Sequence, residues 1–294
     1  MKRRLICCIL LLMLCLPAAR AEEPVSFLDD VERDRVGRIV RTYDTPTLKY
    51  AMEKFGMDGG KCYLIRIWVR DPASQIRKVT ANWKKNVEFP HIMVKQIPEA
   101  VLAVNGSGFI SPLYPWIPEN YPGESKDYYF TPLGSLTITN GEVFRNLEGV
   151  RYYGLTLDDG GLQMYVDEDN ENVLATNPSQ TWSFYVQCPM MRNNEDILPA
   201  EWRFADRRAA RTVIARVDRN NYLILIVEKE KGGGLSLRRI VTFFQDNFNT
   251  EWVYDLDGGD STALIARAQN TKNKKLRLIT DKGAPVADIM VFVE

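Results

Sequence analysis

The chain has 294 residues, of which 45% are hydrophobic, so it is long enough to bury the core of one large domain. It carries 38 basic and 38 acidic residues. This balance argues against a non-specific nucleic-acid binder, which needs a basic surface to displace counterions from phosphates, and we predict no nucleic-acid partner.

The first 21 residues have the pattern of a signal peptide. Lys2, Arg3 and Arg4 precede an apolar stretch, residues 5–16, that is too short to span a bilayer comfortably, and Ala19-Arg20-Ala21 forms a small-x-small cleavage site. Cleavage after Ala21 would remove four basic and no acidic residues, leaving 34 basic against 38 acidic ones. We therefore predict a secreted or periplasmic protein without a stable membrane span. The alternative is a retained anchor.

Cysteine and histidine content limits the chemistry. Of the five cysteines only Cys62 and Cys188 lie beyond the signal peptide, and the sequence leaves open whether they form one disulfide or two buried thiols. His91 is the single histidine. A conventional Ser-His-Asp triad, Cys-His dyad or histidine metal cage needs more than the chain offers, so acid–base chemistry falls mainly to carboxylates.

The first part of the chain is predicted to contain one helical segment and then strands. Residues 22–60 are polar and interrupted by Pro46, and we interpret them as an N-terminal helical extension that ends at Gly59-Gly60. Residues 61–294 then form a single domain. Its first predicted elements are strands at 62–69, 76–81 and 100–104 and a short helix at 91–96.

A long loop at residues 111–129 is rich in proline, tyrosine and tryptophan. Loops of this length in a compact domain are usually functional or disordered, and the aromatic content argues against disorder. Aromatic faces suit sugar rings. The alternative is that the loop packs on its own domain.

The second half of the chain has the pattern of an antiparallel meander. Hairpins are predicted at 135–146 around Asn140-Gly141, at 152–166 and at 213–228. Ser236 caps a helix with its apolar residues on one face, and strands follow at 252–256, 262–266 and 286–293. The predicted fold class is α+β, a mixed, mostly antiparallel β-sheet with flanking helices.

The stretch 252–262, WVYDLDGGDST, is the centre of the functional interpretation. An apolar strand leads to Asp257. Gly258 and Gly259 then allow a tight turn, and Ser261 and Thr262 follow it. A buried strand that ends on an acid beside glycines places a reactive group on a rigid support. The alternative is a turn with no further role, because Asp and Gly favour turns for local reasons.

Three segments occur in a fixed order: AVNGSGF at 103–109, ARTVIARVDRNNYLILIVE at 210–228, and GLSLRRIVTFFQDNFNTEWVYDLDGGDST at 234–262. Together they resemble the phosphodiester glycosidase family, relatives of the lysosomal enzyme that uncovers mannose 6-phosphate. The resemblance covers about residues 60–294. Positions that match the family pattern are Asn105, Gly106, Phe109, Arg211, Thr212, Asp257, Gly258, Gly259 and Ser261, with Glu228 at the acidic end of the hairpin.

The chain also departs from that pattern. Ser107 and Gly108 replace Gly and Phe, Ala215 replaces Gly, and Asp260 replaces the third Gly of the last motif. A second carboxylate beside Asp257 would alter its pKa or favour a cation. These departures put the substrate and the activity in doubt more than the fold.

The resemblance implies hydrolysis of a sugar–phosphate bond. The predicted catalytic carboxylates are Asp257 and Glu228, since glycoside hydrolysis usually needs a pair. Arg211 offers a planar fork of donors to a phosphodiester. The predicted substrate-binding residues are Asn105, Arg211, Thr212, Gly258, Gly259, Ser261 and Thr262. The alternatives are a surface salt bridge for Arg211, a turn residue for Asn105 and a solvated strand end for Glu228.

Three functions follow. The first is an exported hydrolase that cleaves a glycosyl phosphodiester in a glycan or exopolysaccharide. The second is a non-catalytic glycan-binding protein with the same fold. The third is a metal-assisted phosphodiesterase in which Asp257 and Asp260 hold Ca²⁺ or Mg²⁺ through oxygen ligands. No cofactor is certain from the sequence, and the expected partner is a carbohydrate or sugar phosphate.

Overall fold

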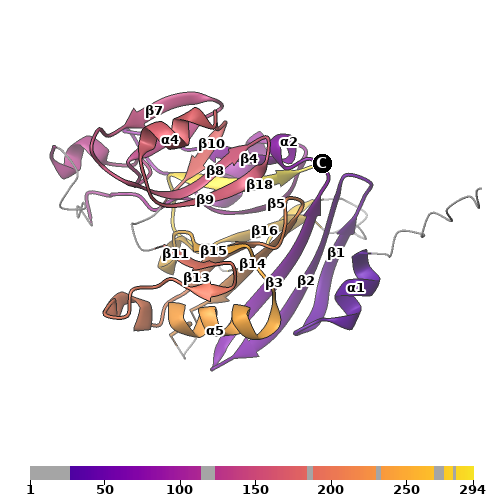
Figure 1. Ribbon diagram of the computed structural model, residues 1–294. Helices are drawn as coiled ribbons and strands as arrows, with labels where there is room; N and C mark the ends of the chain where they lie inside the picture. Colours follow the sequence, from indigo (N-terminus) through magenta and orange to yellow (C-terminus); the bar gives the residue numbers. More distant parts are fainter. Residues whose placement is uncertain (1–26, 114–122, 184–187, 230–232, 268–274, 281–282) are drawn as a thin grey trace, which may run out of the picture. The chain divides into compact units, whose positions relative to one another are not determined.

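The computed structural model describes residues 27–113, 123–183, 188–229, 233–267, 275–280 and 283–294. The chain divides into two units, Met1–Asp34 and Arg35–Glu294. The first unit contributes helix α1 (Phe27–Arg33), and all other elements belong to the second (Figure 1). The predicted signal peptide and its cleavage site lie outside the described residues.

An eight-stranded sheet forms the larger part of the second unit (Figure 1). Each pair of neighbouring strands in it is antiparallel. In spatial order the strands are β1 (Arg38–Asp44), β2 (Leu48–Met57), β3 (Gly60–Val69), β14 (Asn221–Glu228), β13 (Arg211–Arg216), β15 (Trp252–Asp255), β11 (Pro189–Arg192) and β12 (Glu195–Asp196). The predicted strand 62–69 and hairpin 213–228 are confirmed, and both are rich in β-branched and aromatic residues.

The predicted helical extension over residues 22–60 is wrong beyond α1. Residues 38–57 form β1 and β2, and β2 pairs with β3 from Leu48 opposite Val69 to Met57 opposite Gly60. The turn between β2 and β3 explains the error. Asp58 and Gly59 both have positive φ, 48° and 79°, which is the geometry of a tight hairpin. The Asp-Gly pair therefore joins two strands and does not end a helix as the sequence predicts.

A five-stranded antiparallel sheet packs against the first. Its order is β17 (Leu276–Leu278), β16 (Leu264–Arg267), β5 (Ala100–Asn105), β18 (Asp288–Val293) and β4 (Ile76–Thr80). The core between the sheets contains Ile65, Ile224 and Tyr254 from the larger sheet, and Leu102 and Phe292 from the smaller one. This core fixes how the two sheets face each other.

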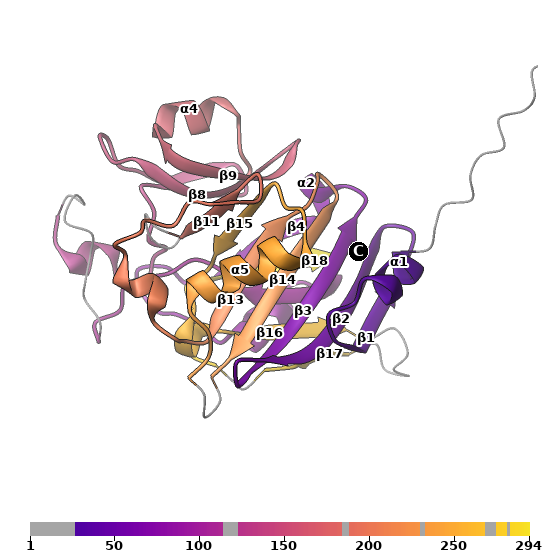
Figure 2. The same cartoon turned by 60° about the horizontal axis from the view of Figure 1, so that its bottom comes forward.

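Helices cover the outer faces of the two sheets. Figure 2 shows α5 (Leu237–Asn247) lying over the large sheet. It packs there through its buried face, and Ser236 caps it by accepting the Arg239 N–H at 3.2 Å, as predicted. The short helices α3 (Pro90–Met93) and η1 (Val94–Gln96) lie against the outer face of the small sheet. The short helix predicted at 91–96 is thus confirmed.

The remaining strands form two small sheets. One has the order β10 (Gln180–Trp182), β8 (Tyr152–Asp158), β9 (Gly161–Glu168), and the other pairs β6 (Leu136–Thr139) with β7 (Glu142–Asn146). The predicted Asn140-Gly141 turn is confirmed by positive φ angles of 51° and 77°. The short helices are α2 (Pro72–Gln75), α4 (Asn170–Ala175), η2 (Ser125–Tyr128), η3 (Arg203–Asp206) and η4 (Gly259–Ser261).

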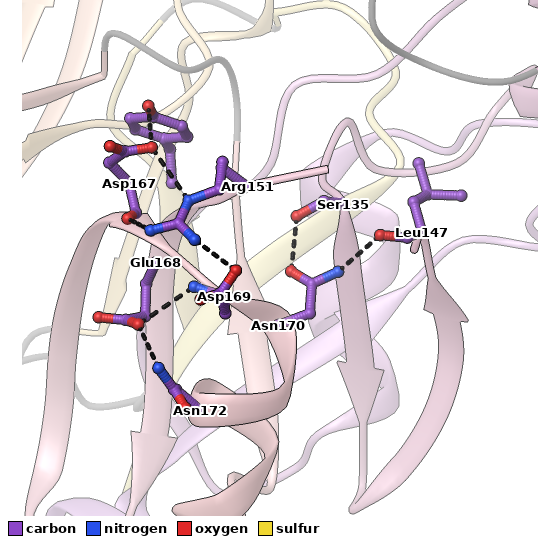
Figure 3. A network of polar contacts seen from close by, with 9 residues as sticks. Ser135, Leu147, Arg151, Asp167, Glu168, Asp169, Asn170 and Asn172 are labelled. Carbon is purple, nitrogen blue, oxygen red and sulfur yellow. Dashed lines mark hydrogen bonds and ion pairs between the residues drawn. The ribbon is translucent and has the colours of Figure 1, made fainter. Parts of the chain in front are cut away.

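Polar side chains join these two small sheets. Asn170, at the start of α4, accepts from the Ser135 hydroxyl at 2.9 Å and donates to the Leu147 carbonyl at 3.1 Å (Figure 3). Beside it, Arg151 forms ion pairs with Asp167 and Asp169. We call the set of Arg151, Asp167 and Asp169 the exposed network.

In the predicted aromatic loop, residues 114–122 lie outside the described part.

The α+β, mostly antiparallel fold class is confirmed. Cys62 and Cys188 are both buried and form no disulfide with each other, because they lie on opposite sides of the large sheet. Cys62 belongs to the core under α5, while Cys188 belongs to the core between the sheets. None of the helices in the described part of the chain has the length and apolar content that a bilayer crossing needs.

Candidate active site

The turn after β15 has the tight geometry predicted for residues 257–262. Gly259 has φ of +63°, and its N–H donates to the Ala210 carbonyl at 2.8 Å. A Cβ on Gly258 would lie 2.8 Å from the same carbonyl oxygen, so a larger residue would push the turn away from β13. Each glycine thus has a separate backbone reason to be glycine.

Asn105 joins the three sequence motifs. Its Nδ2 donates to the main-chain oxygen of Asp257 at 2.6 Å, while its Oδ1 accepts from the Thr212 hydroxyl at 2.7 Å and from the Ala263 N–H at 3.0 Å. Neither Asn105 nor Thr212 has any exposed surface. The motifs therefore meet in space, but these two predicted substrate ligands are bonded to protein groups. Their position suits them to hold the turn.

Arg211 lies in a buried ion pair, so the alternative of a surface salt bridge is wrong. Its Nη1 lies 3.1 Å from Oδ2 of Asp255, and Nη2 donates to the Arg207 carbonyl at 3.1 Å. The guanidinium stacks on Phe204, 5.0 Å from the ring centroid. Among the described residues, Nε of Arg211 and Oδ1 of Asp255 have no hydrogen-bond partner. These two atoms keep unused bonding capacity beside the turn.

Sequence reasoning missed Asp255. It lies two residues before Asp257 at the end of β15, and alternate residues of a strand point to the same face. That spacing, Asp-x-Asp, was the available signal. Burial raises the pKa of Asp255 to about 6, although the charge of Arg211 lowers it.

Asp257 combines burial with a perturbed pKa. Its side chain accepts the Gly258 N–H at 2.9 Å, and the residue is 9% exposed. Burial raises the pKa of Asp257 to about 7, the hydrogen bonds from Ser261 and Gly258 lower it, and the charges of Asp255 and Asp288 raise it again. A carboxyl group with a pKa near neutrality is suited to general acid–base chemistry.

A pocket of about 460 Å³ lies beside the turn. It is lined by Ala210, Glu228, Lys229, Gly259, Asp260, Thr262, Thr280, Gly283 and Ala284. Glu228 is 8% exposed and forms an ion pair with Lys61, so it is not a solvated strand end. The hydrogen bond between Glu228 and Lys61 is the main reason that the pKa of Lys61 is raised. Asp257 and Arg211 are not among the lining residues, so the two predicted catalytic carboxylates do not both line this pocket.

The remaining predicted ligands also belong to the turn. Ser261 hydrogen-bonds the Asp257 carboxylate. Thr262 lines the pocket, and its hydroxyl is buried without a hydrogen-bond partner among the described residues. Asp260 is exposed. Over the described ranges no group of three or more His, Cys, Asp or Glu side chains gathers into a ligand set for a metal. The predicted Ca²⁺ or Mg²⁺ remains a prediction.

Fold and site define an antiparallel protein in which two large sheets pack together and a glycine turn carries a buried acid next to a pocket. A model of the phosphodiester glycosidase family matches residues 98–293, and the chain belongs to this family. No curated protein matches the chain.

Two solved structures are similar in fold. One is the zebrafish N-acetylglucosamine-1-phosphodiester alpha-N-acetylglucosaminidase catalytic domain auto-inhibited by its pro-peptide. It is 16% identical, with a TM-score of 0.63 over 87% of each chain. The other is a hypothetical protein from Synechocystis, 14% identical, with a TM-score of 0.58 over 86% of this chain and 63% of that one. At these identities the likeness shows the fold alone.

Proposed function

We propose that the chain is an exported hydrolase that cleaves a glycosyl phosphodiester, with Asp257 handling the proton. The observation that carries the proposal is the position of Asp257. It lies in the turn that all three motifs of the family build, it is buried, and its pKa is raised to about 7. At neutral pH such a group exists in both protonation states, which general acid–base catalysis requires.

The pocket beside the turn supplies the groups that a sugar phosphate needs. The Lys229 side chain brings a positive charge to its wall, and the Thr262 hydroxyl has bonding capacity left. Glu228 brings a carboxylate to the same wall, where we assign it to the positive charge that develops on the sugar ring. Because phosphate is a good leaving group, proton donation to it is not required, and Asp257 is free to activate water.

The buried residues of the motifs have positioning roles in this proposal. Asn105 and Thr212 hold the backbone of the turn, and Arg211 is held by Asp255 beneath it. The family supports this substrate class, and the name of the zebrafish enzyme states that it acts on an N-acetylglucosamine phosphodiester. Export follows from the predicted signal peptide, and the natural substrate would then be a glycan or exopolysaccharide outside the cytoplasm.

The test is hydrolysis of an N-acetylglucosamine phosphodiester by the wild type and by Asp257→Asn. We expect kcat to fall by about 100-fold or more, because the variant keeps the shape but cannot exchange the proton. Asp246→Asn, on the exposed side of α5, is the matched control and retains full activity. Absence of hydrolysis by the wild type, or full activity in Asp257→Asn, contradicts the proposal. Binding of the glycosyl phosphodiester without hydrolysis favours the glycan-binding alternative.

Asp260 favours one second candidate, the metal-assisted phosphodiesterase. Its carboxylate is exposed and lines the pocket, where a hard cation accepts oxygen ligands. In that case Asp260→Asn and a chelator each abolish hydrolysis, and added Ca²⁺ or Mg²⁺ restores the chelated enzyme. If Asp257 acts without a cation, Asp260→Asn and the chelator leave most of the activity.

A further inference from the structure

A fully buried ion pair, Lys78 with Asp288, lies near the turn of the candidate site. Lys78 belongs to β4 and Asp288 begins β18, and these strands are neighbours in the five-stranded sheet. Nζ of Lys78 lies 3.5 Å from Oδ2 of Asp288, and neither side chain has any exposed surface. The two charges have left water, and one ion pair repays that cost only in part.

Asp288 is bonded directly to the first motif. Its Oδ1 accepts the Ser107 N–H at 2.7 Å, and its main-chain oxygen accepts the Gly106 N–H at 3.0 Å. The main-chain oxygen of Gly106 in turn accepts the N–H of Asp257 at 3.1 Å. A short series of hydrogen bonds thus connects the Asp288 carboxylate with the backbone of the proposed catalytic residue.

The packing around Gly106 shows how close this contact is. A Cβ at position 106 would lie 2.0 Å from Oδ1 of Asp288 and 3.0 Å from Cδ1 of Trp182. A residue with a side chain therefore cannot occupy position 106 unless Asp288 or the turn moves. Glycine at this position allows the carboxylate to reach the Ser107 N–H.

Two aromatic rings and the Asp288 carboxylate surround the Lys78 amine; burial lowers the pKa of Lys78, and Asp288 opposes that shift. Its Nζ lies 5.6 Å from the ring centroid of Trp83 and 5.4 Å from that of Trp182. Among the described residues, Lys78 Nζ, Asp288 Oδ2 and Trp182 Nε1 have no hydrogen-bond partner. Apolar residues of similar size would fill this space at equal or lower cost, so stability does not account for the charges.

We propose that Asp288 is a positioning residue for Asp257, with Lys78 as its counter-ion. The Asp288 carboxylate holds residues 106–107, and residue 106 holds the Asp257 backbone at the correct place beside the pocket. Lys78 keeps a charged acceptor stable in the interior, where an unpaired carboxylate would be too costly. Only the kinetic consequence of this inference rests on the proposed function.

Two double variants separate positioning from stability. Lys78→Met/Asp288→Leu removes both charges and the acceptor for the Ser107 N–H. Lys78→Met/Asp288→Asn removes both charges but keeps a side-chain oxygen at the same place. The measurements are thermal unfolding, amide hydrogen exchange at Ser107 and Asp257, and kcat and KM for the N-acetylglucosamine phosphodiester.

We expect both variants to fold, because replacing both members of a buried pair is often neutral for stability. In the leucine variant, exchange at Ser107 and Asp257 should rise by about tenfold or more, since the turn has lost its acceptor. Its kcat should fall by about 100-fold with little change in KM, the size expected for a displaced catalytic group. The asparagine variant should stay close to the wild type in both amide exchange and kcat.

Several outcomes overturn the inference. The first is normal protection of Ser107 and Asp257 in the leucine variant, and the second is equal loss of protection in both variants. The third is a leucine variant that fails to fold while the asparagine variant folds, because the acceptor then serves the whole fold. The fourth is a loosened turn with unchanged kcat. If the wild type hydrolyses nothing, the proposed function fails, and the exchange measurements still decide the inference.

Discussion

Two sets of charged side chains in this protein use the same chemistry in opposite surroundings. Near the turn after β15, the pairs Arg211–Asp255 and Lys78–Asp288 are almost completely buried. In the exposed network, the side chain of Arg151 is 42% exposed and those of Asp167 and Asp169 are each 63% exposed (Figure 3). Water and salt screen the exposed pairs, so the loss of one partner costs much more stability in a buried pair than in an exposed one. This difference in burial indicates that the turn after β15 must be held rigidly, while the exposed network need not be.

The largest effect is expected at Arg211. Arg211→Ala leaves the Asp255 carboxylate buried without its partner, so the free energy of unfolding should fall by about 3–5 kcal/mol. Urea unfolding at pH 7 measures this loss. Arg211→Met/Asp255→Leu removes both charges and should recover most of it. A double variant as unstable as the single one would show that the unpaired charge is not the cause.

The pH dependence of stability should also come from the buried set. Burial raises the pKa of Asp257 from its ordinary 3.8 to about 7 and that of Asp255 to about 6. The folded protein therefore holds protons that the unfolded chain releases between about pH 4 and pH 7, and stability falls as the pH rises through this window. A shift of one unit is worth about 1.4 kcal/mol, so the Asp257 contribution amounts to a few kcal/mol.

Urea unfolding at pH 5 and pH 8 tests that contribution. Asp257→Asn should reduce the loss of stability between the two pH values. Asp167→Asn is the control from the exposed network, where hydrogen bonds from Tyr153 and Arg151 lower the pKa of the carboxyl group, and it should leave the loss unchanged. An unchanged loss in Asp257→Asn would mean that this carboxyl group titrates normally.

Two glycine substitutions, one near the buried pairs and one in an exposed turn, compare the two surroundings through smaller changes in stability. Gly106→Ala should cost about 3 kcal/mol, because its Cβ would collide with the Asp288 carboxylate and overpack the interior. Gly141→Ala, in the β6–β7 turn, meets nothing within 4 Å and should cost about 1 kcal/mol for its positive φ. Thermal unfolding compares them directly. Equal costs would show that residues 106–107 can move freely.

The smallest effect is expected in the exposed network. Arg151→Ala removes both exposed ion pairs, and it should leave the urea midpoint within the error of the measurement because such pairs contribute little. Unfolding in low and high salt provides the check. A clear loss of stability that disappears in high salt would make this network more important than its exposure indicates.

Local patterns predicted much of the fold. The alternation in β3 and β14, the Asn140-Gly141 turn and the Ser236 cap are each decided by a few adjacent residues, and each is confirmed. The strands β1 and β2 were missed because they depend on pairing with β3, and the Asp58-Gly59 turn was the one local signal for that pairing.

The candidate site was predictable only in part. Local backbone geometry predicts the turn at Gly258 and Gly259 and the place of Asp257 beside it. It does not predict which of the site's side chains are buried. An asparagine that binds a ligand and one that braces a turn have the same place in a motif, so the match of Asn105 to the family pattern does not separate these two roles. The pairing of Lys78 with Asp288 joins residues 210 positions apart and has no local pattern. Such contacts become visible only when the strands are in place.

The position of β18 has a consequence for biogenesis. This strand lies between β4 and β5, and Asp288 stands at its start. Its partners Thr80 in β4 and Asn105 in β5 both come much earlier in the chain. The edge strand β4 therefore has no partner in this sheet until β18 has been synthesised, and pairing across such separations is slow. A polypeptide that must thread through a translocation channel before it folds gains from this delay. In the exported protein that we propose, the five-stranded sheet would be completed only when β18 has left the channel.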